Sequence, residues 1–230
     1  MRIIGLSSGA TGRASNVDRI VRSVMERTGW ESEFVKLTDL TFTGCKGCAD
    51  LCAKPQVCKV EDDLYPYYHS LKDADAIVLG ASVYFDSINA TMRAFVERFY
   101  GYRHVSIAIS GKPVILALAG GGPTGKAMEE FRQLMEPFNL NVVDTINYCS
   151  RVPPCFICGR HTDCSIGGLY QMMGEAAHTV EVAPEMFNRW EDEHEVIEAI
   201  GRSVAELKGL YEDEDSAAPE APAADSVSSQ

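Results

Sequence analysis

No apolar stretch in this sequence reaches the ~20 residues that a membrane-spanning helix needs. The amino terminus has only Arg2 followed by the short apolar run 3–6, which is too brief for a secretory signal. Basic residues are scarce, because 21 Lys and Arg face 33 Asp and Glu and the formal net charge is −12. The basic stripe that nucleic acids require is therefore missing. These absences predict a cytoplasmic protein that binds neither a membrane nor a nucleic acid.

The carboxyl end of the chain lacks basic residues altogether. Residues 212–230 carry six acidic side chains, so the other 211 residues have a net charge of only −6. The same segment lacks aromatic residues and is rich in Ala, Pro and Ser. Such a composition cannot bury enough apolar surface to offset the entropy cost of ordering. We therefore expect a disordered acidic tail over 212–230.

The sequence also lacks the GxGxxG fingerprint and the Walker loop, so the common dinucleotide and ATP signatures are absent. Instead, a predicted strand over 2–6 leads into the polar loop 7–16, and an amphipathic helix follows that stops near Gly29. Backbone N–H groups at a helix start can bind a phosphate. The additional side-chain donors in the loop are Ser7, Ser8, Thr11, Arg13, Ser15 and Asn16. An ordinary capping turn is the alternative, but this excess of donors favours a phosphate monoester.

Four further segments are predicted strands, over 33–37, 76–79, 113–119 and 141–148. Amphipathic patterns predict helices over 66–72, 90–100, 128–138 and 193–211. Strands that alternate with helices imply an α/β protein with a doubly wound parallel sheet. Five strands and a phosphate loop without GxGxxG fit the flavodoxin-like order. We therefore expect a flavodoxin-like, five-stranded parallel sheet with cysteine-rich loop insertions.

Two of these strands end in loops that are typical of ligand sites. The first loop contains Ser82, Val83, Tyr84, Phe85, Asp86 and Ser87. The second is the run Gly120, Gly121 and Gly122. Open α/β sheets bind ligands at the carboxyl ends of their strands, and glycines let a flat ligand approach the backbone closely. Core packing is the alternative for the two aromatic residues.

The eight cysteines fall into two groups of four. The first group is Cys45, Cys48, Cys52 and Cys58, with gaps of two, three and five residues. The second group is Cys149, Cys155, Cys158 and Cys164, with gaps of five, two and five. Four thiolates suit zinc or an iron–sulfur cluster, and a reducing compartment favours such sites over disulfides. Unconnected buried thiols and a disulfide pair are the alternatives, and His161 could replace Cys149 in the second group.

Taken together, these motifs resemble the iron–sulfur flavoproteins, within the flavodoxin-like, NAD(P)H-dependent FMN reductases. The resemblance rests on the three polar loops and on the first cysteine group, which Asp62 and Asp63 follow. It implies that the loops bind FMN and that the first cysteine group holds a [4Fe–4S] cluster close to the flavin. The implied organisation is an FMN-binding domain over 1–150, with a cysteine-rich loop at 41–65. A cysteine-containing extension and a final helix over 151–211 would follow.

The expected function is that of an FMN-dependent redox protein that passes electrons between a one-electron carrier such as ferredoxin and a two-electron acceptor. NAD(P)H is an alternative donor, and the second cysteine group could hold a second cluster or zinc. One rival is an NAD(P)H-dependent FMN or quinone reductase with structural zinc, and another is a non-enzymatic electron-transfer module. We expect a homo-oligomer and predict no catalytic acid or base.

Overall fold

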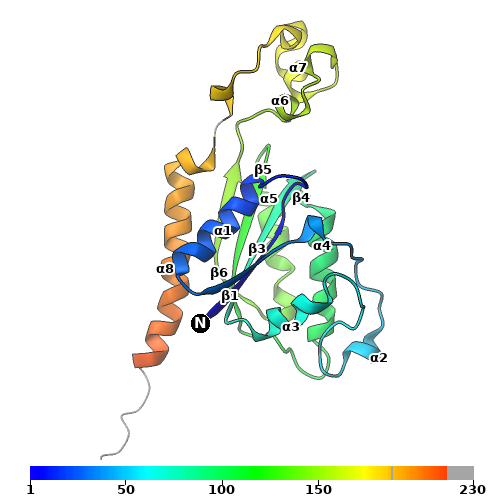
Figure 1. Ribbon diagram of the computed structural model, residues 1–230, viewed down its shortest axis with the longest axis vertical. Coiled ribbons are helices and arrows are strands. Elements are labelled where there is room, and N and C mark those ends of the chain that lie inside the picture. The colour runs from blue at the N-terminus through cyan, green and yellow to red at the C-terminus, as the bar shows by residue number, and fades with distance from the viewer. Residues whose placement is uncertain (188, 217–230) are drawn as a thin grey trace, which may run out of the picture.

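The computed structural model describes residues 1–187 and 189–216 (Figure 1). Its strands are β1 (Arg2–Ser8), β2 (Glu31–Lys36), β3 (Ala76–Tyr84), β4 (Ser87–Ile88), β5 (Pro113–Gly120) and β6 (Asn141–Cys149). Its α-helices are α1 (Asn16–Thr28), α2 (Ala49–Cys52), α3 (Tyr65–Asp73), α4 (Ala90–Glu97), α5 (Gly125–Gln133), α6 (Pro154–Cys158), α7 (Gly168–Met173) and α8 (His194–Ser216). Short 3-10 turns include Arg98–Tyr102, Glu136–Phe138 and His161–Asp163.

Within the described residues, the parallel strands form one sheet in the order β2-β1-β3-β5-β6. Counted along the chain, this is the flavodoxin-like order 2-1-3-4-5, so the predicted fold class is confirmed. The two-residue strand β4 adds an antiparallel pairing to β3 that the sequence analysis did not include. The turn between them holds Phe85 and Asp86 at φ values of 52° and 60°, as a tight two-residue hairpin requires.

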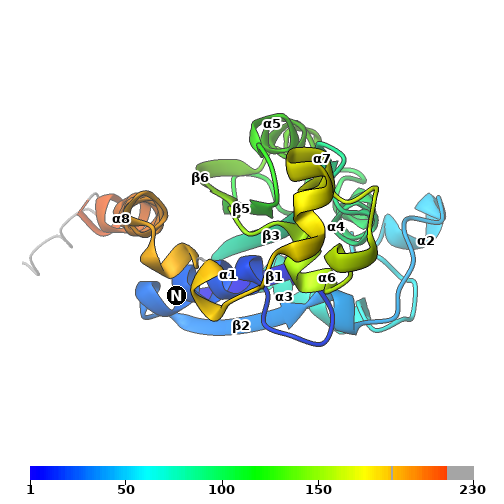
Figure 2. The same cartoon turned by 90° about the horizontal axis from the view of Figure 1, so that it is seen from above.

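Helices cover both faces of the sheet (Figures 1 and 2). Residues of α1 and α8 pack on one face, and residues of α3, α4 and α5 pack on the other. A parallel strand buried on both sides has no polar face, and Ile77, Val78 and Leu79 in β3 are all buried. This burial explains why the central strands β1, β3 and β5 appear in the sequence as largely apolar runs, whereas the edge strands β2 and β6 keep polar residues. No helix among the described residues is long and apolar enough to cross a membrane.

Helix α1 is set by signals at both of its ends. Ser15 Oγ accepts a hydrogen bond from the Asp18 N–H, and the Asp18 carboxylate accepts one from the Ser15 N–H, which is a capping box. The helix stops at Gly29, whose φ of 70° is the left-handed conformation that favours glycine. The buried apolar residues of the helix are Val17, Ile20, Val21, Val24 and Met25. The predicted stop at Gly29 is confirmed.

Residues 151–211 contribute two different structures. Residues 150–187, here called the cap segment, rise above the carboxyl ends of the strands and contain α6 and α7 (Figures 1 and 2). Helix α8 instead packs against α1 and β6 and joins the core of the sheet. Its buried residues there are Val196, Ile200, Val204 and Leu207. The helix continues to Ser216, past Glu212 where the acidic tail was expected to begin, and 217–230 lie outside the described residues.

Truncation should separate the contribution of α8 from that of the acidic segment. Removing everything after Glu212 keeps Leu207 and also Tyr211, whose hydroxyl donates to the Asp75 carbonyl oxygen at 2.7 Å. We expect the melting temperature to change little. Removing everything after Glu193 deletes the four buried aliphatic side chains of α8 and uncovers the surface of α1 and β6 on which they pack. Because burial of each such side chain stabilises the fold by about 2 kcal/mol, cooperative unfolding should be lost. Circular dichroism melts measure the melting temperature of both truncated proteins. A large fall in melting temperature after removal of residues 213–230 would contradict the prediction that these residues contribute little to stability.

Candidate functional site

A cavity of about 690 Å³ opens at the carboxyl ends of the strands. This volume lies within the range of about 300–1,000 Å³ that is usual for small-molecule sites. The predicted residues that line it are Arg13, Ser15, Asn16, Ser82, Val83, Tyr84, Gly120 and Gly121. The cap segment supplies further walls through Ser150, Val152, Pro154, Ile157, Pro184 and Phe187. The fold therefore brings all three predicted loops to one cavity and adds a wall that the sequence analysis missed.

Three of the predicted loop donors do not line this cavity. Ser7 and Ser8 are fully buried, and their hydroxyls donate to Asp18 Oδ1 at 2.6 Å and to the Gly80 carbonyl oxygen at 3.4 Å. Thr11 lines a separate, smaller hollow beside α4. The hydroxyls of the two serines are therefore engaged within the protein, and they stabilise the loop without facing the cavity.

The second predicted loop divides at the hairpin. Tyr84 lines the cavity and is 57 % exposed, whereas Phe85 is fully exposed at the hairpin tip. Asp86 lies 3.7 Å from Lys126, and the Ser87 hydroxyl donates to Glu130 at 2.6 Å. Of the predicted glycines, Gly122 does not line the cavity, and a Cβ there would meet only open space. In these two loops, the residues at or next to the strand ends line the cavity, and the residues further along do not.

A buried carboxylate lies beneath the first loop. The Asp18 side chain is 2 % exposed and accepts hydrogen bonds from Ser7, from the Ser15 N–H and from Lys36 Nζ, the last at 2.9 Å. Burial opposes ionisation, but the bonds from Ser7, Lys36 and Ser15 outweigh it and hold the pKa of Asp18 below its usual value. A Cβ on Gly9 would lie 1.9 Å from Ser15 Oγ, so this position has no room for a side chain. The Ser15–Asp18 spacing is the sequence signal that could have identified this capping arrangement.

Arginines from distant parts of the chain also reach the cavity. Arg13, Arg19 and Arg189 all line it. Arg19 Nε lies 2.6 Å from a carboxylate oxygen of Glu191, and Arg189 lies 3.7 Å from the same oxygen. Arg13 was predicted, but Arg19 and Arg189 were not. More than 160 residues separate these two in the sequence, so no local pattern could have paired them.

The first cysteine group lies in the loop that contains α2. Cys52 and Cys58 are buried, Cys48 is half-buried and Cys45 is exposed. Burial raises the pKa of Cys52, and the nearby Cys48, Cys58 and Cys45 raise it further. The four predicted ligands are thus close enough to affect one another electrostatically, although no three of them are gathered as a metal site among the described residues. All four are free thiols in this structure.

Arg98 anchors the loop that contains the first cysteine group. Its side chain is fully buried and donates to Cys58 Sγ at 3.2 Å and to the Val60 carbonyl oxygen at 3.1 Å. It also donates to the Thr43 carbonyl oxygen at 3.3 Å and forms an ion pair with Asp62. The five N–H donors of one guanidinium thus connect both ends of the cysteine loop. Arg98 was not predicted from the sequence, because it lies 40 residues beyond Cys58.

The first cysteine group does not lie against the cavity. Asn89, at the start of α4, donates to the Ser8 carbonyl oxygen at the cavity end of that helix. The loop containing α2 instead contacts the turn Arg98–Tyr102 beyond the other end of α4. An eight-residue helix is about 12 Å long, so roughly this distance separates the two sites. The first cysteine group therefore lies near the end of α4 that is remote from the cavity.

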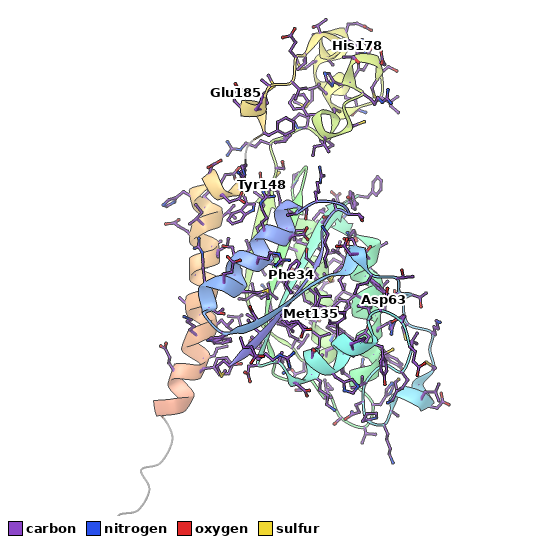
Figure 3. All side chains as sticks on the ribbon, viewed as in Figure 1. Phe34, Asp63, Met135, Tyr148, His178 and Glu185 are labelled. Atoms are coloured by element: carbon purple, nitrogen blue, oxygen red, sulfur yellow. The ribbon has the colours of Figure 1, made fainter. Side chains whose placement is uncertain are left out.

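The second cysteine group is spread over two structures. Cys149 ends β6 and is exposed, whereas Cys155, Cys158 and Cys164 belong to the cap segment. Figure 3 shows that His178 in the cap segment lies far from Asp63, which follows the first cysteine group, so the two groups are well separated. Among the residues that the structure describes, no set of three or more His, Cys, Asp or Glu side chains is already gathered as a metal site.

The strand order and the cavity at the strand ends define a flavodoxin-like α/β protein with room for a mononucleotide. Residues 1–153 match the family model described as NADPH-dependent FMN reductase. The match covers well over half of the chain, so the protein belongs to the NADPH-dependent FMN reductase family. The family resemblance predicted from the sequence is confirmed.

Individual relatives agree with this assignment. The chain is 32 % identical over 101 residues to an iron–sulfur flavoprotein of Methanocaldococcus jannaschii, covering 43 % of this chain and 51 % of that protein. It is 28 % identical over 133 residues to an iron–sulfur flavoprotein of Methanosarcina thermophila, covering 56 % and 68 %. The chain thus spans about half the length of the first relative. An oxidoreductase of Corynebacterium diphtheriae superposes with a TM-score of 0.55 at 16 % identity over 93 % of this chain and 98 % of its own, which shows the fold alone.

The Asp18 network predicts a pH-dependent loss of stability. Because the folded-state pKa of Asp18 is lowered, its contribution is present at neutral pH and is lost as the pH falls below the ordinary value of 3.8. Asp18→Asn should therefore lower the free energy of unfolding by about 2 kcal/mol at pH 7, and the deficit should shrink in acid. Denaturant titrations between pH 7 and pH 3 measure this difference. The exposed Asp39→Asn is the matched control, and an equal deficit at all pH values would contradict the assignment.

Replacing Arg98 should release the first cysteine loop. Arg98→Met leaves Asp62 without its ion-pair partner, which should cost about 3–5 kcal/mol of stability. The buried thiol of Cys58 should then react faster with a thiol reagent in the metal-free protein. Arg98→Lys keeps the charge but cannot reach all four acceptors, so its effect should be intermediate. Arg103→Met, on an exposed side chain of the same turn region, should behave as wild type, and unchanged Cys58 reactivity in Arg98→Met would contradict the anchoring role.

Proposed function

We propose that this protein is an FMN-dependent oxidoreductase that passes electrons between a one-electron carrier such as a ferredoxin and a two-electron acceptor. A [4Fe–4S] cluster bound by Cys45, Cys48, Cys52 and Cys58 would exchange the single electrons. The observation that carries the proposal is one fold that presents both a mononucleotide-sized cavity and a compact loop of four thiols. Assembly of several copies and NAD(P)H as an alternative donor are further parts of the proposal.

The residues around the cavity fit FMN. Bound FMN would supply both one-electron and two-electron chemistry. The positive charge of Arg13, Arg19 and Arg189 suits a phosphate, although Glu191 already offsets part of it. Gly120 and Gly121 line the cavity with backbone alone, which lets a flat ring approach closely. The protein would thus bind and orient the flavin without a residue that transfers a proton.

The cap segment would limit access of water to the flavin. Ile157 and Phe187 line the cavity from the cap side and present apolar surface to it. Tyr84 lines the same cavity and stays more than half exposed, so a ring bound there would have one accessible edge. Such an edge is where a donor or an acceptor could approach.

The first cysteine group fits an iron–sulfur cluster in its donor set. Four thiols come from one loop, and thiolates are the usual ligands of such clusters. Arg98 donates to Cys58 Sγ, and the Gly47 N–H donates to Cys45 Sγ at 3.5 Å. Hydrogen bonds and positive charge near the sulfurs stabilise the negative charge of a cluster and adjust its potential. The relatives in Methanocaldococcus jannaschii and Methanosarcina thermophila are themselves described as iron–sulfur flavoproteins.

An NAD(P)H-dependent FMN or quinone reductase is the second candidate. In that case zinc in the first cysteine group would be structural. The observation that favours it is the separation of about one α4 length between this group and the cavity, because a structural zinc site does not have to lie against the flavin. A non-enzymatic electron-transfer module would use FMN and an iron–sulfur cluster, as in the first proposal, but would release no reduced product.

Anaerobic purification of the full chain tests the proposal. The protein should contain FMN and not FAD, together with about four irons and a cluster signal by electron paramagnetic resonance. Cys48→Ser should lose the iron but keep the FMN, because the cavity lies beyond the other end of α4. The control Cys149→Ser changes an exposed thiol outside the first group and should keep both.

The electron donor decides between the two candidates. Reduced ferredoxin should bleach the flavin of the wild type and fail with Cys48→Ser, because the electrons would pass through the cluster. Rapid bleaching by NADPH in both proteins, together with zinc in place of iron, would instead establish the reductase. Release of FAD on denaturation would reject the FMN assignment.

A further inference from the structure

The cap segment has very little apolar core of its own. Within residues 150–187, all of which the structure describes, the buried hydrophobic residues are Val152, Leu169 and Ala177. The segment contains no strand, and its helices α6 and α7 have only five and six residues. A unit of this kind cannot be held together by apolar burial and usually needs a covalent or metal crosslink. Three cysteines and His161 lie in its first fifteen residues.

Two of these cysteines already converge. An ideal Cβ on Gly167 would lie 3.0 Å from Cys155 Sγ and 3.1 Å from Cys164 Sγ, so both sulfurs face the space that this glycine leaves free. The Gly167 N–H donates to Cys164 Sγ at 3.1 Å, and the Leu169 N–H donates to Cys155 Sγ at 3.5 Å. Backbone N–H donors stabilise a thiolate relative to a thiol. The thiolate is the form that binds a metal.

Helix α6 and the turn after it keep the third cysteine, Cys158, near Cys155. Cys155 and Cys158 lie three residues apart in α6, a spacing that places side chains on the same side of a helical turn. Gly159 then reverses the chain at a φ of 70°, and its N–H donates to the Cys155 carbonyl oxygen at 2.9 Å. The exposed thiol of Cys158 is thus free to turn toward the other two.

His161 supplies a buried nitrogen that lacks a partner. The residue is 9 % exposed, and its Nε2 lies 2.8 Å from the Val180 carbonyl oxygen. A carbonyl oxygen only accepts, so Nε2 carries the proton and Nδ1 presents a lone pair. No hydrogen-bond partner reaches this buried Nδ1 among the described residues. A ring fixed by a backbone carbonyl, with its other nitrogen open, is the arrangement typical of a metal-binding histidine.

From these observations we infer that Cys155, Cys158, His161 and Cys164 form a closed structural zinc site in the cap segment. Three thiolates and one imidazole are an established tetrahedral zinc ligand set. The four side chains are not at binding distance of one point in this conformation, so zinc would draw Cys158 and His161 toward the two converged sulfurs. Cys149 is not a ligand, because it belongs to β6, where Gly120 is its neighbour in the sheet.

This zinc site would also shape the flavin cavity. Pro154 and Ile157, which alternate with the ligands of α6, line that cavity directly. Phe156 contacts both His161 and Phe187, with ring centroids 6.1 Å and 6.2 Å apart respectively. Zinc would therefore hold the cap wall in place over the flavin. This second consequence rests on the proposed function, whereas the zinc site itself does not.

Metal analysis of the full-length protein tests the ligand set. The wild type should bind one zinc that survives both removal of the flavin and the Cys48→Ser change. Cys158→Ser and His161→Ala should abolish the zinc, and Gly167→Ala should weaken it at least about tenfold by filling the space beside two sulfurs. The matched controls Cys149→Ser and His178→Ala should retain it. His161→Cys should restore zinc binding, which separates loss of a ligand from loss of folding.

Cobalt substitution gives an independent readout. Sulfur-to-cobalt charge-transfer absorption should correspond to three thiolates in the wild type and to four in His161→Cys. Zinc retained by His161→Ala but lost by Cys149→Ser would overturn the inference. Iron in place of zinc at this site would also overturn it. A Cys155–Cys164 disulfide, found in protein whose free thiols were blocked before analysis, would do the same. FMN affinity should fall about tenfold in the zinc-free variants. Zinc binding without any such fall would leave the site standing and reject only its coupling to the flavin.

Discussion

A single buried carboxylate joins three parts of the chain beneath the cavity. Asp18 accepts hydrogen bonds from Ser7 at the end of β1, from Ser15 at the start of α1 and from Lys36 in β2. Lys36 also donates to the Arg13 carbonyl oxygen, so the loop between β1 and α1 is held at both of its ends. The loop must keep this path, because Gly9 has no room for a side chain. The loop that lines the cavity thus depends on a buried charge, and Asp18 itself does not line the cavity.

The two cysteine groups show two different ways of holding thiols. The first is anchored to the core by Arg98, whose guanidinium links Cys58, Thr43, Val60 and Asp62. Within the described part of the chain, no buried arginine anchors the second group, which lies mostly in a cap segment with little apolar burial. The first loop is therefore tied to the sheet domain by contacts within the protein, whereas the proposed zinc would supply the crosslink of the cap segment. This difference gives the two groups separate roles in one flavin-binding fold.

Much of the fold and part of the site could be predicted from local patterns. All five parallel strands were predicted to within two residues at their starts. The signal was clearest for β1, β3 and β5, because strands buried on both faces contain few polar positions. The three strand-end loops were placed at one cavity for a general reason, since parallel strands end at the same edge. The hairpin at Phe85 and Asp86 was missed, because a bulky residue such as Phe85 is rarely found at positive φ. Arg98 was missed for another reason, since buried arginines have no local signature.

The sequence by itself determined the order of strands and helices, the two groups of thiols and the loop chemistry that suits a phosphate. These are local properties, because each follows from the spacing of residues along the chain. Only the tertiary structure decided that Ser7 and Ser8 support Asp18 and do not face the cavity. It also decided that the cap segment forms a wall of the cavity and that His161 has a buried nitrogen without a partner. Those properties depend on which surfaces meet after folding, and no spacing in one chain segment encodes that meeting.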